Sequence, residues 1–199
     1  MQRGCSMAED DGSETIARGE RIALRRFRES DLEVWHRHMN TAEARKHLGG
    51  VGTAEESEAR FRRQAASWDE ESGGWLAIER TDDGTFLGYC GFGPIQTECA
   101  PDGLRGEHEI GWGLRPDCWG HGYATEAAHC ALEVAFERFG VETMFSQTSE
   151  ANRGSWRVME RLGMERAGHL DYDDPAYPPD ENPTKVYCLT RGDWQARNA

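Results

Sequence analysis

The chain has 199 residues, of which 37% are hydrophobic, and carries a formal net charge of −13 at pH 7. This length favours a single domain that can bury a sizeable core. The charge argues against nucleic acid as a partner, because neutralising phosphate groups requires a basic face. It suits cationic acceptors such as protonated amines, although acidity that serves only solubility is the simpler explanation.

Residues 1–18 predict a flexible acidic tail, since they carry four acidic residues and almost no apolar periodicity. They lack the apolar segment of a signal peptide, and no later stretch resembles a membrane span. Six cysteines are scattered along the chain without a Cys-x-x-Cys pair, which argues against a zinc site and a disulfide scaffold. We therefore expect a cytoplasmic protein with reduced thiols, no metal and no membrane partner.

Residues 19–195 predict one domain in which strands and helices alternate. A loosely alternating segment at 21–27 predicts the first strand. Two capping boxes, in which a Ser or Thr precedes a Glu by three residues, predict helices that begin at Ser30 and Thr53. A hairpin is expected next, with strands at 75–78 and 86–92 joined by a turn at 82–84.

The second half of the chain continues this alternation. Apolar residues at helical spacing predict a helix over about 123–139, which Gly140 ends. An acidic, proline-rich loop occupies 171–183. The other predicted elements are a strand that ends at Leu114, a strand over 142–148, a short helix over about 153–162 and a final strand over 185–189.

A glycine-containing turn between the strand that ends at Leu114 and the next helix predicts a phosphate site. Gly120 and Gly122 let successive backbone N–H groups turn toward one point, and the N-terminus of the helix adds partial positive charge. A dinucleotide fingerprint would need a third glycine where Thr125 stands. A P-loop would need Lys and Ser or Thr directly after the last glycine, where Tyr123 begins the helix instead.

A second block, Asn152-Arg-Gly-Ser-Trp-Arg-Val-Met-Glu-Arg-Leu-Gly-Met164, follows at a suitable distance. Together the two blocks resemble the GNAT acetyltransferase superfamily, especially the branch of the Rim-type ribosomal-protein N-terminal acetyltransferases. The resemblance covers nearly the whole chain. It implies an α/β (α+β) GNAT fold, with a central mixed, mostly antiparallel sheet of about seven strands flanked by about four helices.

The resemblance also implies an acetyl-CoA site. Pyrophosphate would be held by backbone N–H groups, and pantetheine would pair with backbone groups near the end of the preceding strand. The Asn152 side chain would bind the pantetheine amides, while arginines beside the two blocks would supply positive charge. The implied cofactor-binding residues are Leu114, Arg115, Gly120, Gly122, Tyr123, Ala124, Asn152, Arg153 and Arg157.

Three residues are candidates for the chemistry. Glu107 and Glu109 lie two apart before the glycine turn and could deprotonate an amine, unless they are only solvated charges at a sheet edge. Glu109 ranks first, because glutamate precedes an Ile-Gly run in the Rim-like branch as well. Some branches carry a base where Gln147 stands here, and Gln cannot take that role. Ser155, three residues after Asn152 as in the Rim-like branch, would assist the departing sulfur.

The function that we predict is transfer of an acetyl group from acetyl-CoA to a primary amine, by direct attack in a ternary complex. The acceptor is a protein N-terminus or a small amino compound such as an aminoglycoside or a polyamine. By resemblance, the loop at 171–183 borders the acceptor cleft. The alternative is a non-catalytic acyl-CoA-binding sensor of the same fold, and a homodimer also stays open.

Overall fold

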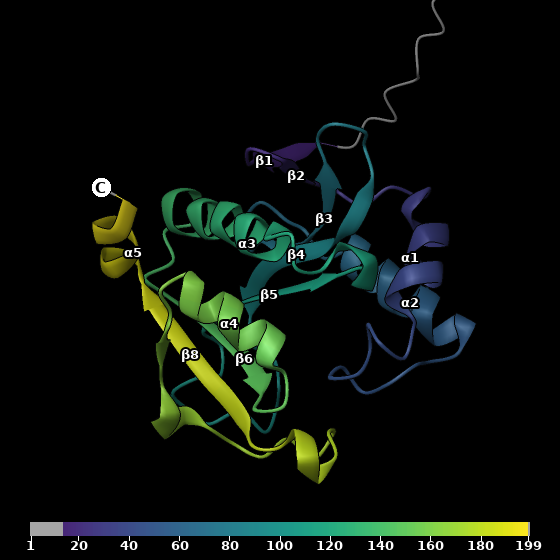
Figure 1. Cartoon of the computed structure of the whole chain (residues 1–199). Helices are drawn as coiled ribbons and strands as arrows, with labels where there is room; N and C mark the ends of the chain where they lie inside the picture. Colours follow the sequence, from purple (N-terminus) through teal and green to yellow (C-terminus); the bar gives the residue numbers. More distant parts are fainter. Residues whose placement is uncertain (1–13, 199) are drawn as a thin grey trace, which may run out of the picture.

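The computed structural model describes residues 14–198. Within them the chain forms eight strands in one sheet and five α-helices (Figure 1). None of these helices is long and apolar enough to cross a membrane. The elements are β1 (Thr15–Arg18), β2 (Ile22–Arg25), α1 (Asp31–Met39), α2 (Ala54–Ala65), β3 (Gly74–Arg80), β4 (Phe86–Pro94), β5 (His108–Leu114), α3 (Tyr123–Glu133), β6 (Thr143–Ser149), α4 (Arg153–Arg161), β7 (Glu165–Arg166), β8 (Thr184–Thr190) and α5 (Arg191–Asn198).

The strands are ordered β1-β2-β3-β4-β5-β6-β8-β7 across the sheet. Among the strands of the described residues only β5 and β6 pair in parallel, so the sheet is mixed and mostly antiparallel, as predicted. It has one strand and one helix more than expected, namely β1 and α5. Strand β1 lies in the segment that we assigned to the tail. That assignment rested on the lack of apolar periodicity, whereas the backbone pairing of β1 with β2 does not require such a pattern. Residues 1–13 of the predicted tail lie outside the described residues.

Helices cover both faces of the central strands (Figure 1). Along β3, Leu76 and Ile78 point into the core that the alanine-rich face of α3 completes. The intervening Ala77 packs with Trp35 of α1 and Phe61 of α2 on the opposite face. This alternation is the period of two that a strand buried on both faces requires.

The two predicted capping boxes differ in outcome. Thr53 caps α2 as expected, since its hydroxyl accepts the N–H of Glu56 at 3.2 Å and the Glu56 carboxylate accepts the N–H of Thr53 at 2.8 Å. The box at Ser30 is wrong, because Ser30 has helical dihedrals and makes no side-chain cap. Asp31, the first residue of the helix, instead accepts the N–H of Arg28 at 2.8 Å, so it binds the segment before the helix.

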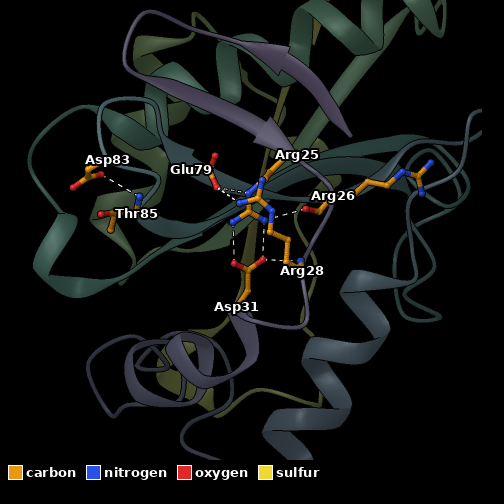
Figure 2. A network of polar contacts seen from close by, with 7 residues as sticks. All are labelled: Arg25, Arg26, Arg28, Asp31, Glu79, Asp83 and Thr85. Atoms are coloured by element: carbon orange, nitrogen blue, oxygen red, sulfur yellow. Dashed lines mark hydrogen bonds and ion pairs between the residues drawn. The ribbon is translucent and has the colours of Figure 1, made fainter. Parts of the chain in front are cut away.

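Asp31 also belongs to a buried ion network that fixes α1 on the sheet (Figure 2). Arg25 is only 2% exposed and donates two hydrogen bonds to Asp31, at 2.8 and 2.9 Å. It also donates to Glu79 of β3 at 2.6 Å, and Arg28 shares that carboxylate at 2.8 Å. The network therefore ties β2, β3 and the start of α1 together.

Strands β5 and β6 separate soon after they begin (Figure 1). Among the described residues their pairing covers only His108 with Met144 and Glu109 with Phe145. One further link is the hydroxyl of Ser146, which donates to the carbonyl of Ile110 at 2.9 Å. The rest of β5 pairs with β4 alone, so it presents an open edge inside the sheet.

Candidate active site

The turn before α3 has the geometry that the glycines predicted. Gly120 and Gly122 have φ of +80° and +84°, in the left-handed region that side chains with a Cβ rarely adopt. Helix α3 begins directly afterwards at Tyr123, so its first N–H groups have no acceptor within the helix. These N–H groups gather at a helix N-terminus, which is the arrangement that binds phosphate.

Arg21 braces this turn and has no counterpart in our sequence predictions. Its guanidinium donates to the carbonyl of His121 at 3.0 Å and pairs with Glu126 at 2.8 Å. It also lies over the ring of Tyr123, 5.0 Å from the centroid. Because a trans peptide points its C=O and N–H in opposite directions, the N–H of Gly122 is directed away from Arg21.

A cavity of about 1610 Å³ lies in front of the turn. Its lining is cationic although the whole chain is acidic, with seven Lys or Arg side chains against Glu43 and Glu126. A polyanionic ligand such as a pyrophosphate fits this charge. The predicted site residues that line this first cavity are Leu114, Gly120, Gly122, Tyr123, Ala124, Asn152, Ser155 and Arg157.

Three predicted site residues are not brought to either cavity. The guanidinium of Arg115 is held by Asp117, at 2.6 and 3.1 Å, and by the carbonyl of Phe86 at 3.1 Å. This pairing also turns Asp117 away from the first cavity and lowers the pKa of its carboxyl. Arg153 is exposed at the start of α4, and Glu107 is exposed before β5 begins.

The backbone at the end of β5 is partly occupied. The N–H of Arg115 donates to Leu87 at 2.9 Å and so faces β4. By the alternation of an antiparallel ladder, Trp112 and Leu114 face the open edge. The carbonyl of Leu114 already accepts the indole N–H of Trp119 at 2.9 Å, which leaves the backbone of Trp112 as the better partner for an extended ligand.

A second cavity, of about 320 Å³, adjoins the first where β5 and β6 separate. Trp112, Asn152 and Ser155 line both cavities. Glu109, the preferred candidate base, lines the second. The structure thus brings three of the predicted residues, Glu109, Asn152 and Ser155, to one place although they come from β5 and from the start of α4.

Glu109 belongs to a hydrogen-bonded chain of three side chains. The amide N–H of Gln147 donates to Glu109 at 2.6 Å, and the hydroxyl of Tyr172 donates to the carbonyl oxygen of Gln147 at 2.7 Å. Burial raises the pKa of Glu109, and the hydrogen bond from Gln147 opposes that rise only in part. The carboxylate is thereby a stronger base than an exposed glutamate.

The lining of the second cavity is acidic and aromatic. Besides Glu109 it contains Asp174 and Glu181, and among the described residues it contains no Lys or Arg. Asp174 comes from the loop that we predicted at the acceptor cleft, whereas its neighbour Asp173 is exposed and lines neither cavity. The aromatic members of the lining, whose ring faces suit a cation, are Trp75, Tyr89, Trp112, Tyr172 and Tyr177.

The start of α4 is fixed by its cap. The side-chain oxygen of Asn152 accepts the N–H of Ser155 at 3.3 Å, so Asn152 is the N-cap of the helix. Asn152 also lines both cavities. Ser155 is half-buried at the same junction and lines both cavities.

Comparison with known proteins identifies the family of this chain. A family model described as an acetyltransferase (GNAT) domain matches residues 21–165. The FsC-acetyl coenzyme A-N(2)-transacetylase of Aspergillus fumigatus is 31% identical over 61% of this chain, which spans about half (52%) of that relative's length. The uncharacterized N-acetyltransferase YnaD of Bacillus subtilis is 26% identical over 74% of this chain and 81% of its own length.

Solved structures of acetyltransferases share the fold. A GNAT acetyltransferase from Bacillus anthracis has a TM-score of 0.72 at 23% identity, over 88% of this chain and 98% of its own. The aminoglycoside acetyltransferase AAC(6')-Ib in complex with coenzyme A has 0.69 at 19% identity, over 89% and 99%. RimL, a ribosomal L7/L12 alpha-N-protein acetyltransferase, has 0.69 at 17% identity, over 96% and 98%. At these identities the likeness shows the fold alone.

Proposed function

Because this chain belongs to the GNAT acetyltransferase family, in which acetyl-CoA is the acyl donor, we propose that it acetylates a primary amine bound in the second cavity. The observation that carries the proposal is the junction of the two cavities. A cationic cavity with a phosphate cradle meets an acidic cavity that contains the half-buried carboxylate of Glu109, and Asn152 and Ser155 line both.

The donor would lie in the first cavity. Backbone N–H groups of Gly120, Gly122, Tyr123 and Ala124 would hold its pyrophosphate, with Arg157 nearby as a positive charge. The pantetheine arm would run along the open edge of β5 toward Ser155. Acetyl-CoA supplies the activated acyl group as a thioester at the end of that arm.

The acceptor amine must lose a proton before it can attack, since an α-amine has a pKa of about 8 and a lysine of about 10.4. Glu109 is the candidate base, because burial raises its pKa toward the range in which a carboxylate takes protons efficiently. The nitrogen would then attack the thioester carbonyl directly, with both substrates bound. A hydrogen bond from the Ser155 hydroxyl to the departing sulfur would assist its release.

Within the family, we assign the chain to the Rim-type branch on two features of its sequence. Glu109 directly precedes an Ile-Gly run, and Ser155 stands three residues after Asn152. This assignment favours a protein N-terminus as the acceptor. A small amino compound is the alternative, and the second cavity, at the small end of the range for ligand pockets, suits it equally well.

The test is release of CoA thiol from acetyl-CoA in the presence of a panel of amines, together with calorimetric titration of CoA. We expect CoA to bind and at least one amine class to accelerate thiol release strongly. CoA binding without amine-dependent release by any peptide or small amine would contradict acetyl transfer and favour the sensor alternative.

A further inference from the structure

Two arginines in the wall of the first cavity, Arg45 and Arg60, are half-buried, and neither has a carboxylate partner among the described residues. Within the part of the chain that the structure describes, no Asp or Glu lies within ion-pair distance of either guanidinium, whereas most of the other described arginines are paired. The other unpaired cations of this cavity are exposed, namely Lys46, Arg157, Arg161 and Arg197. A half-buried guanidinium has lost part of its hydration, so a bound anion stabilises it more than it stabilises an exposed guanidinium.

The loop between α1 and α2 holds both guanidinium groups in place with neutral oxygens. Arg45 donates to the carbonyl of Gly50 at 3.0 Å and to that of Leu48. Arg60 donates at 2.8 Å to the side-chain oxygen of Asn40, which also accepts the N–H of Gly52. A guanidinium has five N–H donors, so donors remain for a ligand after these bonds.

Both arginines line the first cavity, next to residues that line both cavities. Leu48, whose carbonyl binds Arg45, lines both cavities, and so does Gln64, one helical turn after Arg60 in α2. The charge of Arg45 also reaches the second cavity. It opposes the rise in the pKa of Tyr177 that burial and the charge of Asp174 cause.

We propose that Arg45 and Arg60 bind an anionic group of the acceptor, so that the acceptor is an amine that also carries a carboxylate or a phosphate. This inference rests on the proposed function. The acidic cavity around Glu109 would take the amine, and the two arginines would take the opposite charge at the junction. An anion bound there would neutralise two like charges that the loop holds near each other, and it would gain charge-assisted hydrogen bonds.

Matched acceptors test the proposal through a ratio of kcat/KM values. Each pair shares one amine and differs only in a carboxylate against the carboxamide: 4-aminobutanoate against its amide, and peptides that begin Ala-Glu against Ala-Gln. We expect the acid to be preferred about 10- to 100-fold, the worth of charged hydrogen bonds. The series with the larger preference identifies a small molecule or a peptide as the source of the anion. No preference in either series would overturn the proposal.

Variants assign the preference to the arginines. Arg45→Gln and Arg60→Gln should each bring the ratio close to one and leave the KM for acetyl-CoA unchanged. Arg63→Gln, at an exposed position of α2 outside both cavities, should keep the wild-type ratio. If the substitutions only disturbed the loop, kcat/KM would fall equally for the acid and the amide, and their ratio would stay at the wild-type value. That result would overturn the assignment.

A binding measurement separates this inference from the proposed activity. We expect inorganic phosphate to bind saturably to protein that is already saturated with CoA, and about 10-fold more weakly to the Arg60→Gln variant. This outcome would support the anion site even if none of the amines were acetylated, in which case only the proposed function would fail. Loss of phosphate binding on adding CoA, with a raised KM for acetyl-CoA in the variant, would assign the pair to the donor and overturn the inference.

Discussion

Replacing Glu109 with glutamine removes the proposed base and preserves the size and the hydrogen-bond acceptor of the side chain. The two side chains have the same length, and the new amide oxygen can still accept the N–H that Gln147 donates at 2.6 Å. Folding and CoA binding should therefore persist. We expect kcat to fall by about 10²–10⁴, the usual worth of a general base.

The pH dependence of stability gives a second readout that does not need turnover. Burial raises the pKa of Glu109 in the folded protein, so the folded state holds this proton more tightly than the unfolded state does. The free energy of unfolding of the wild type should therefore decrease as pH rises from the unfolded pKa through the higher folded pKa. The glutamine variant lacks that decrease. In urea denaturation, its free energy of unfolding relative to that of the wild type should therefore increase over the same pH window and stay constant above it.

The assay is thiol release at saturating acetyl-CoA over a range of pH. Wild-type kcat/KM should fall on the acidic side, because the proposed base acts as a carboxylate. The pH of this fall should be higher than the usual pKa of a glutamate, since burial raises the pKa of Glu109. Raising the pH should partly rescue Glu109→Gln, since more of the amine is then neutral. Glu107→Gln, exposed and outside both cavities, should behave like the wild type. A loss of less than about threefold for Glu109→Gln at every pH would refute the role of base.

Three further variants test other parts of the structure. Gly122→Val forces a β-branched residue to φ of +84°, so calorimetry should find CoA binding lost in a protein that still unfolds cooperatively; unchanged affinity would contradict the cradle. Asp31→Ala removes one of the two carboxylates that pair with Arg25, which is 2% exposed, and urea denaturation should show a loss of about 3 kcal/mol in the free energy of unfolding. A loss below about 1 kcal/mol would contradict the network. Asp174→Asn should raise the acceptor KM about 10-fold and leave the KM for acetyl-CoA unchanged; an equal effect of the exposed Asp173→Asn would show only a general charge effect.

Features that depend on neighbouring residues were predictable from the sequence. The cap of Thr53 needs only Glu56, three residues on, and the turn at Gly120 and Gly122 needs only backbone freedom and the helix that follows. Asn152 is an N-cap for the same local reason. The donor half of the candidate site could therefore be outlined before the fold was known.

Features that depend on contacts between distant residues were not predictable. At the start of α1, Ser30 makes no side-chain cap, and the neighbouring Asp31 pairs with Arg25, which lies on another element. Arg21 reaches the glycine turn across 100 residues of sequence, and no local pattern marks it. The chain from Glu109 through Gln147 to Tyr172 likewise joins β5, β6 and a loop, so only the fold brings these residues together.

If the donor binds along the open edge of β5 as proposed, the stability of the folded protein would depend on the supply of that donor. Backbone groups there have no partner strand, and such edges invite local opening and pairing with other chains. A donor whose pantetheine arm paired with this edge would take the place of the missing strand and would bind only the folded state. At a donor concentration of 100 times the dissociation constant, mass action would add about 2.7 kcal/mol to the free energy of unfolding. The resistance of the enzyme to proteolysis and aggregation would then follow the metabolic state of the cell.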